Sequence, residues 1–243
     1  MDLQLTSRRA LVTGAAGGIG RAAVDALAAE GARVGAIDVV EHVRGIADPA
    51  CVADLTDADG TAAAVDACAR ELGGIDVLVL AAGVSGPVGT PLAETRVADW
   101  EHVFAVNVTG AFLTLRAAVP WLRRSAAPAV VVVASDSALV ATPGMAPYGA
   151  SKAALLQLAR AAAVELAPEG IRVNAVCPSI VDTPMSRGDL GMPEGFAGAD
   201  YPVQTPAEVA DQIALLASPR LRPVSAATWV SDFGVSARSG FPA

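Results

Sequence analysis

The stretch Thr13-Gly14-Ala15-Ala16-Gly17-Gly18-Ile19-Gly20 decides the fold of this chain. It follows an apolar run of strand length, Ala10–Thr13, and opens an Ala-rich stretch of helix length. Gly14, Gly18 and Gly20 let the backbone turn tightly and approach an anion at the helix N-terminus, where free N–H groups and the helix dipole favour negative charge. A glycine-rich turn between a strand and a helix therefore predicts binding of a dinucleotide pyrophosphate.

Outward from this turn, apolar runs alternate with Ala-rich stretches along the chain. Runs that are apolar throughout suit strands of a parallel sheet with helices on both faces. The alternation predicts an α/β fold with a Rossmann-type doubly wound sheet in three layers, and no polar linker divides it, so we expect a single domain over 1–243. The expected strands are Ala10–Thr13, Arg33–Ile37, Cys51–Ala53, Val77–Ala81, Val130–Ala134, Arg172–Val176 and Thr228–Val230. The expected helices are Ile19–Glu30, Asp57–Leu72, Val97–Arg123, Pro147–Leu166 and Pro206–Leu216.

Two segments carry more specific expectations. Pro120 is expected to kink or end the helix over 97–123, because proline lacks the backbone donor that a helix interior needs. Residues 186–201 are rich in glycine and almost without periodicity, so a mobile loop is expected there. This segment follows a strand end, where ligands bind in such sheets. We therefore expect a substrate loop over about 184–204.

Composition excludes several classes of protein. The chain is 53% hydrophobic and 17% charged, which predicts a packed domain and not disorder. Its net charge of −8 argues against nucleic-acid binding, which requires a basic face. The apolar run 129–134 is too short to span a bilayer, and the N-terminus lacks the pattern of a signal peptide, so we expect a cytoplasmic protein without membrane binding. Three scattered cysteines without a CxxC spacing and two distant histidines predict neither a disulfide framework nor a metal site.

Asp38 stands at the end of the second expected strand. A carboxylate at this position can accept hydrogen bonds from the adenosine ribose, and it would repel the 2′-phosphate of NADP. No Lys or Arg lies in the glycine-rich turn or directly after Asp38 to offset that repulsion. We therefore predict NAD as the cofactor. The alternative is that Asp38 merely caps a loop.

Tyr148 and Lys152 are spaced i, i+4, so a helix places both on one face. A phenol with an ordinary pKa near 10 is a poor base, but a neighbouring ammonium or an oxidised nicotinamide lowers that pKa. Tyr148 can then exchange a proton with an alcohol near neutral pH. Ser135 follows the valine-rich strand, and its hydroxyl can hold the substrate oxygen. For the pair, the alternative is a solvated helix face, but the Ala- and Leu-rich helix around it gives little reason for an isolated exposed pair. For Ser135, the alternative is a serine in the turn at the strand end.

Together these motifs resemble the short-chain dehydrogenase/reductase family over nearly the whole chain, about 5–238. The resemblance implies four catalytic residues, in which an asparagine holds a water joined to the lysine and the lysine also binds the nicotinamide ribose: Asn107, Ser135, Tyr148 and Lys152. It implies cofactor contacts by Gly14, Gly18, Ile19, Gly20, Asp38, Asp54, Leu55, Ala82, Gly83, Tyr148, Lys152, Val181 and Thr183. Among these, Asp54 and Leu55 match the adenine-contacting pair, and Thr183 matches a contact to the nicotinamide carboxamide.

The chain departs from the family pattern at two places. Leu80-Ala81 stand where relatives have two asparagines, which predicts that a polar brace beneath the cofactor is missing. Ser179 stands where relatives have glycine. We expect Ser179 either to narrow the space beside the nicotinamide or to add a hydrogen bond to the substrate.

The predicted activity is the NAD-linked interconversion of a secondary alcohol, cyclic or hydroaromatic, and its ketone. Two alternatives remain: reduction of a 3-oxoacyl thioester, and a regulatory or scaffold protein that binds NAD without chemistry. Apolar residues on several faces of the long helices predict a homo-oligomer, a dimer or a tetramer. Residues expected to line the substrate pocket are Ser135, Ser137, Met145, Ser179 and Met185, with Met192, Phe196 and Tyr201 from the loop, for which ordinary packing is equally open.

Overall fold

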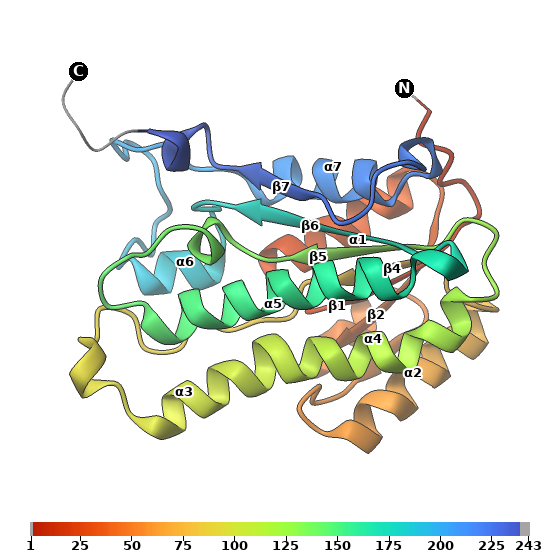
Figure 1. Ribbon diagram of the computed structural model, residues 1–243, viewed down its shortest axis with the longest axis horizontal. Coiled ribbons are helices and arrows are strands. Elements are labelled where there is room, and N and C mark those ends of the chain that lie inside the picture. The colour runs from red at the N-terminus through yellow and green to blue at the C-terminus, as the bar shows by residue number, and fades with distance from the viewer. Residues whose placement is uncertain (1, 239–243) are drawn as a thin grey trace.

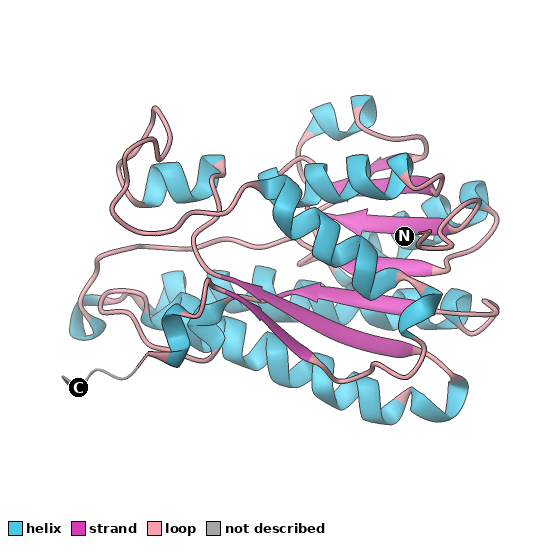
Figure 2. Cartoon of the chain, turned by 90° about the horizontal axis from the view of Figure 1, so that it is seen from above, coloured by secondary structure: helices cyan, strands magenta, loops and turns pink. Residues whose placement is uncertain are grey.

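The computed structural model describes residues 2–238 as a seven-stranded sheet between two layers of helices (Figures 1 and 2). The strand order is β3-β2-β1-β4-β5-β6-β7, and every neighbouring pair is parallel. The predicted Rossmann-type, single-domain α/β fold is therefore confirmed. The strands are β1 (Arg9–Thr13), β2 (Arg33–Asp38), β3 (Ala50–Val52), β4 (Val77–Leu80), β5 (Ala129–Val133), β6 (Arg172–Pro178) and β7 (Thr228–Ser231).

Helices cover both faces of the sheet. On one face lie α1 (Gly18–Ala29) and α7 (Pro206–Ala217), and on the other lie α2 (Ala58–Leu72), α4 (Ala111–Leu122) and α5 (Ala146–Glu165). Helix α3 (Val97–Phe104) leads into α4, and the short helix α6 (Pro184–Asp189) lies beyond the carboxyl ends of the strands (Figure 1).

Each layer of helices buries its own half of the core. Leu11 packs on the α2–α4–α5 side together with Leu115, whereas the next residue, Val12, packs on the α1–α7 side with Ile213. Successive side chains of a strand point to opposite faces, so a sheet covered on both sides needs apolar residues throughout. This requirement explains the uninterrupted valine run of β5, all of whose residues are buried.

The helix expected over 97–123 is present, but its interior differs from the expectation. A π-helical turn, Ala105–Gly110, separates α3 from α4 without ending the helix. Pro120 does not end the helix either, because α4 continues to Leu122. A proline so close to the C-terminus leaves few later turns to disturb. The irregularity therefore falls at the π turn, a feature that is frequent at functional sites.

The combined helix Val97–Leu122 is long and apolar enough to cross a membrane by length and composition alone. However, 44% of its most apolar window is buried inside the protein. Leu113 and Leu115 are among the buried residues, and Leu115 belongs to the core beneath α2 and α5. The helix is therefore a core helix of the domain.

The prediction of a loop over 186–201 is wrong for its first residues, because helix α6 extends to Asp189. Thr183 caps this helix. Its hydroxyl accepts a hydrogen bond from the Ser186 amide at 3.2 Å, and the Ser186 hydroxyl accepts one from the Thr183 amide at 3.1 Å. A capping box usually carries Glu or Gln three residues after the N-cap. Ser186 stands at that position here, so the usual pattern did not predict the helix start.

Candidate active site and cofactor-binding site

The predicted site residues gather at the carboxyl ends of the strands, beside the point where the strand order reverses between β1 and β4. Gly14 follows β1, Gly83 follows β4, Ser135 follows β5 and Thr183 follows β6. Ligands of open α/β sheets bind in the crevice at such a switch point, because the connections on its two sides run in opposite directions.

The three glycines of the turn are required by close packing. Gly14 has a φ of +65°, and a Cβ there would lie 2.6 Å from the Ala82 backbone. A Cβ on Gly20 would lie 2.0 Å from the Gly14 carbonyl oxygen, and one on Gly18 would lie 2.6 Å from the Thr183 side chain. The turn, the segment after β4 and the start of α6 therefore form one cradle, which fits the predicted pyrophosphate site at the α1 N-terminus.

Ile19 and Val181, two further expected cofactor contacts, flank this cradle. Ile19 is half-buried and packs on the core of the α1–α7 side, which also includes the buried Val181. Val181 forms an isolated parallel bridge with Gln204, so the chain returns beside β6 after α6 and the loop that follows it.

Asp38 connects the end of β2 to the glycine-rich turn. Its Oδ2 accepts a hydrogen bond from the Ala16 amide at 2.9 Å, and its Oδ1 accepts one from the Val40 amide at 3.3 Å. The carboxylate therefore does cap a loop, as the alternative interpretation held. It also lies directly beside the turn expected to hold the nucleotide, so the two interpretations are compatible.

Asp54 and Leu55, the expected adenine contacts, follow β3. The Asp54 carboxylate is exposed and accepts hydrogen bonds from the Thr56 amide at 2.9 Å and the Thr56 hydroxyl at 2.7 Å. These two bonds hold the pKa of Asp54 below its ordinary value. Leu55 is buried against the π turn, where a Cβ on Gly110 would come within 3.2 Å of the Leu55 side chain.

Thr13 supplies a polar link beneath the cradle, where Leu80 and Ala81 have apolar side chains. The buried Thr13 hydroxyl donates to the Val79 carbonyl at 3.3 Å and accepts from the Ala81 amide at 3.3 Å. It thereby fastens the end of β1 to the end of β4. Nothing in the motif pattern singled out Thr13, because its role depends on which strand lies next to β1.

Lys152 and Tyr148 lie on α5, as predicted. Lys152 is 5% exposed, and its Nζ donates a hydrogen bond to the Val133 carbonyl at the end of β5, at 3.0 Å. The same Nζ lies 5.6 Å from the centre of the Tyr148 ring. It also faces Gly83, where a Cβ would come within 3.4 Å of it. The ammonium is thus fixed between α5, β5 and the segment after β4.

The pKa values of this pair are shifted by burial. Burial raises the pKa of Tyr148 to about 12. The carboxylates of Asp136 and Asp189 contribute to this rise, whereas the hydrogen bond with Ser135 opposes it. Burial likewise lowers the pKa of Lys152 to about 8. In the protein without its cofactor the phenol pKa is therefore raised, because desolvation of the phenol is the largest influence on it. Lys152 instead directs its Nζ to the Val133 carbonyl.

Ser135 lies two residues after the end of β5 and faces the phenol of Tyr148. It is 6% exposed, its hydroxyl donates to the Asp136 carboxylate at 3.0 Å, and it accepts from the Ser137 amide at 3.1 Å. These bonds fix the Ser135 side chain. The structure therefore brings the serine, the tyrosine and the lysine together in one place.

Asn107 occupies the π turn and is fully buried. Its Oδ1 accepts from the Val84 amide at 2.8 Å, and its Nδ2 donates to the Val84 carbonyl and the Ser151 hydroxyl, both at 2.9 Å. Ser151 in turn donates to the Tyr148 carbonyl at 2.7 Å. Asn107 and Ser151 thus join the segment after β4 to the helix that carries the tyrosine. The sequence patterns did not single out Ser151, although it directly precedes Lys152.

A cavity of about 290 Å³ opens between the start of α5 and the chain that precedes it. Ser137 and Met145, both expected pocket residues, border it together with Leu92 and Val140. Ser179 and Met185 do not border this cavity; the Ser179 amide bonds the Ser231 carbonyl at 2.9 Å, and Met185 is 42% exposed on α6.

The loop residues Met192, Phe196 and Tyr201 also lie away from this cavity. Phe196 is buried, and Tyr201 meets it edge to face with ring centres 6.4 Å apart. Met192 is half-buried, and its amide bonds the Arg187 carbonyl at 2.9 Å. These contacts hold the loop together, which favours the packing alternative for the aromatic pair.

Asp189, at the end of α6, reaches across the site. Its Oδ1 accepts a hydrogen bond from the Ser85 hydroxyl at 2.9 Å, which ties α6 to the segment after β4. Burial raises the pKa of Asp189, opposed by this hydrogen bond. Arg187, the neighbouring cation, is already paired with Asp182 at 2.6 Å. Neither Asp189 nor Ser85 belongs to the recognised motifs.

Comparisons with known proteins identify relatives of this chain. The family model described as "Enoyl-(Acyl carrier protein) reductase" matches residues 14–236. The chain is 39% identical to 2-(R)-hydroxypropyl-CoM dehydrogenase of Xanthobacter autotrophicus, over 93% of this chain and 97% of that protein. It is 38% identical to cis-4-hydroxycyclohexanecarboxylate dehydrogenase of Sinomonas cyclohexanicum, over 98% and 100%.

A solved structure extends the likeness to three dimensions. The 3-ketoacyl-(acyl-carrier-protein) reductase of Brucella melitensis, complexed with NADH, matches with a TM-score of 0.86 and 29% identity. The match covers 96% of this chain and 100% of that one. The fold and site thus define a nicotinamide-dependent oxidoreductase. The chain belongs to the short-chain dehydrogenase/reductase family, and it acts on the alcohol group of a small molecule.

Proposed function

We propose that this protein interconverts a secondary ring alcohol and its ketone with NAD as the hydride carrier. One observation carries the proposal: the phenol of Tyr148, the ammonium of Lys152 and the hydroxyl of Ser135 converge beside the glycine cradle. NAD, when bound, accepts hydride from the alcohol carbon. A panel of ring alcohols with NAD, followed by NADH absorbance, tests the activity, and no NADH from any alcohol would contradict it.

In the proposed mechanism the chain's own residues bind the substrate oxygen and move its proton. Ser135 and Tyr148 hold the oxygen, and Tyr148 takes the proton as hydride leaves the carbon. Lys152 holds the nicotinamide ribose and supplies positive charge near the phenol. Asn107, through Ser151, fixes the tyrosine-bearing helix and supports the proton path to solvent. Val181, Thr183 and the segment after β4 hold the nicotinamide end.

Asp38 supports NAD over NADP, since its carboxylate would face a 2′-phosphate. Asp38→Asn keeps the oxygen that accepts from Ala16 but removes the charge. We expect this variant to reduce the kcat/KM preference for NAD over NADP by roughly tenfold, which corresponds to about 1.4 kcal/mol of relieved repulsion. Steady-state kinetics with both cofactors measure the ratio. Asp25→Asn, an exposed site on α1, is the control, and an unchanged ratio in Asp38→Asn would refute the role.

The charges around the phenol support an uncharged substrate. The carboxylates of Asp136 and Asp189 both act on Tyr148, and Arg187 is already paired with Asp182. The relative from S. cyclohexanicum is named for a ring alcohol that carries a carboxylate. Val133–Asp136 and Tyr148–Leu155 also resemble 2,3-dihydro-2,3-dihydroxybenzoate dehydrogenase, whose substrate is likewise an anion. We take the ring alcohol from these likenesses and not the anionic group.

Asp189→Asn tests this selection by charge. We expect the variant to raise kcat/KM for 4-hydroxycyclohexanecarboxylate by about tenfold, because a like charge is removed near the substrate. The value for cyclohexanol should change far less, since the amide keeps an acceptor for Ser85. Glu194→Gln, which removes an exposed charge from the loop directly after α6, is the control. An equal gain for both substrates, or the same gain in the control, would reject the proposal.

Reduction of a 3-oxoacyl thioester is the second candidate, favoured by the likeness to the B. melitensis reductase. Natural acyl carriers bring an anionic phosphopantetheine arm, which the acidic surroundings of Tyr148 disfavour. Acetoacetyl thioesters with NADH, compared with ring alcohols with NAD, separate the two activities. Formation of NADH from any alcohol also rules out a scaffold protein without chemistry.

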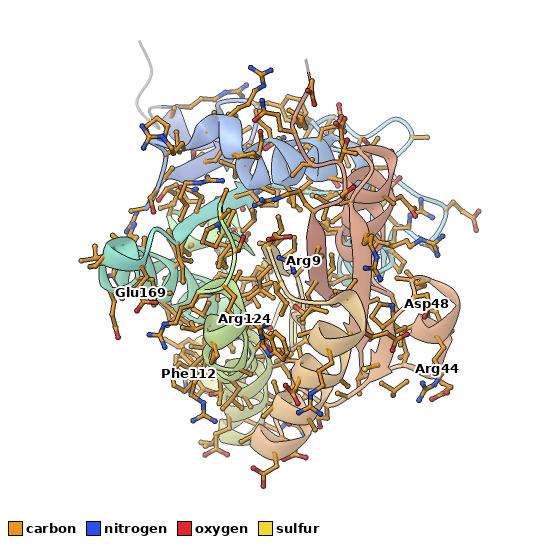
Figure 3. The ribbon with its side chains drawn as sticks, turned by 90° about the vertical axis from the view of Figure 1, so that its right-hand side faces the viewer. Arg9, Arg44, Asp48, Phe112, Arg124 and Glu169 are labelled. Atoms are coloured by element: carbon orange, nitrogen blue, oxygen red, sulfur yellow. The ribbon has the colours of Figure 1, made fainter. Side chains whose placement is uncertain are left out.

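We also propose that the chain forms a dimer or a tetramer and that residues 184–204 cover the substrate. Large apolar side chains stand exposed on the long helices, including Val97, Phe112 and Val164, at 71%, 44% and 74%. Phe112 lies on the outer side of α4 (Figure 3). Size-exclusion chromatography with light scattering tests the assembly, and a monomer at micromolar concentration would contradict it.

A further inference from the structure

Two thiols distant in sequence meet at the edge of the sheet. Cys51 lies in β3, the edge strand, and Cys68 lies on α2. Their sulfur atoms are 3.2 Å apart, with the Cys68 thiol directed at the Cys51 sulfur. Cys68 is fully buried, whereas Cys51 is half-buried. The sequence predicted no disulfide framework from the spacing, and the fold brings this pair together.

The surroundings restrict what this pair can form. Within residues 2–238, no three His, Cys, Asp or Glu side chains are grouped as metal ligands, so a thiolate metal site is not supported. Two facing thiols on their own can form a disulfide, for which the sulfur atoms must approach to about 2.05 Å. The required movement is on the order of 1 Å, within reach of side-chain rotation in a three-residue edge strand.

We propose that Cys51 and Cys68 are an oxidant-responsive dithiol that closes to an intrachain disulfide when the protein meets a hydroperoxide. The Cys51 sulfur, as thiolate, attacks the peroxide; an S–O bond forms, the O–O bond breaks, and an alcohol or water leaves with one proton. The Cys68 sulfur then attacks Cys51; the S–S bond forms, the S–O bond breaks, and hydroxide leaves as water with the Cys68 proton. Two thiols are oxidised to one disulfide and one peroxide is reduced.

The order of the two steps follows from exposure and hydrogen bonding. Cys51 is the more accessible sulfur, so a peroxide from solvent reaches it before Cys68. Burial raises the pKa of Cys68, together with the contact to Cys51, so Cys68 keeps its proton until Cys51 is oxidised. Cys177 is fully buried in β6, and burial raises its pKa to about 11, so it serves as an internal control.

The disulfide would fasten the edge strand to the helix that packs beside it. It closes a loop that contains Asp54 and Leu55, the segment placed beside the π turn. Closing such a loop restricts the unfolded chain, so the oxidised protein should melt roughly 5–10 °C higher than the reduced protein. Dithiothreitol should reverse the shift.

Thiol counting on the full chain tests the proposal. Reduced protein is treated with hydrogen peroxide, denatured, labelled with N-ethylmaleimide and weighed by intact mass spectrometry. We expect one label in place of three, a protein mass lower by two hydrogens before labelling, and a linked pair of Cys51 and Cys68 peptides. The Cys177→Ser variant has two thiols, and peroxide treatment should remove both of its labels. Three labels after peroxide, or a disulfide between two chains on a non-reducing gel, would overturn the proposal.

Single variants test the order of the steps. Cys68→Ser should accumulate added oxygen on Cys51, because the second thiol is missing. Cys51→Ser should leave Cys68 reduced and labelled. Neither variant should show the rise in melting temperature with peroxide. Oxidation of Cys68 in the absence of Cys51, at a rate equal to that of Cys51, would refute the assignment of Cys51 as the first sulfur attacked.

Discussion

Tyr148→Phe should lower kcat by at least on the order of 10³-fold while NADH binding changes little. The substitution removes only the hydroxyl that exchanges a proton with the substrate. The ring stays in place, and so do the glycine cradle and Lys152, whose Nζ is held by the Val133 carbonyl. Stopped-flow or steady-state NADH absorbance measures turnover, and NADH fluorescence titration measures binding. Turnover near the wild-type rate would exclude Tyr148 as the proton carrier.

The cofactor's effect on the phenol can be measured directly. The chain has two tyrosines, so Tyr201→Phe leaves Tyr148 as its single phenol. In the free variant, burial keeps the pKa of Tyr148 well above 10, and no phenolate absorbance should appear below pH 10. Saturating NAD brings a positive nicotinamide ring to the phenol and should move its ionisation to lower pH. An identical titration with and without NAD would mean that the cofactor does not face Tyr148.

Lys152→Met should also abolish most of the activity, by roughly 10²–10³-fold, because a buried positive charge beside the reacting oxygen is lost. The same substitution should stabilise the folded protein at pH 7. The pKa of Lys152 is lowered to about 8, so folding disfavours its charged form, and at pH 7 the wild type holds a buried charge at a cost. Methionine has a similar length and carries no charge.

The sign of the pH dependence follows from the lowered pKa. Between pH 8 and 10.5 the unfolded chain binds a proton at Lys152 that the folded chain has released, so wild-type stability rises with pH there. The stability advantage of Lys152→Met over wild type should therefore shrink by roughly 2–3 kcal/mol from pH 7 to pH 10. Urea unfolding at both pH values measures it. A constant difference would show that the lysine pKa is not lowered.

The fold was predictable because its signals are local. Apolar runs of strand length, Ala-rich helices and the glycine-rich turn each act within a few residues, and they fixed the order of elements along the chain. Weaker local signals were misread: the capping serine of α6 replaces the usual Glu or Gln, and Pro120 falls too near a helix end to stop it. The π turn around Asn107 leaves no pattern that distinguishes it from α-helix.

The candidate site was predictable as far as its residues belong to motifs. Tyr148, Lys152 and Ser135 were recognised by spacing and strand position, and the structure places them together. Ser151, Thr13 and Asp189 were not recognised, because each acts on a partner from another part of the chain. Their partners are neighbours only after the strands have taken the order of the sheet.

The sequence by itself determined the α/β alternation, the glycine cradle and the tyrosine–lysine face, since each depends on residues a few positions apart. Tertiary structure alone decided the electrostatics of the site. Burial raises the pKa of Tyr148 and lowers that of Lys152, and the carboxylate of Asp189, at the end of α6, comes within range of the phenol. It also decided that Cys51 meets Cys68. Desolvation and long-range contact depend on which surfaces the packed layers exclude from water, and no local pattern records that.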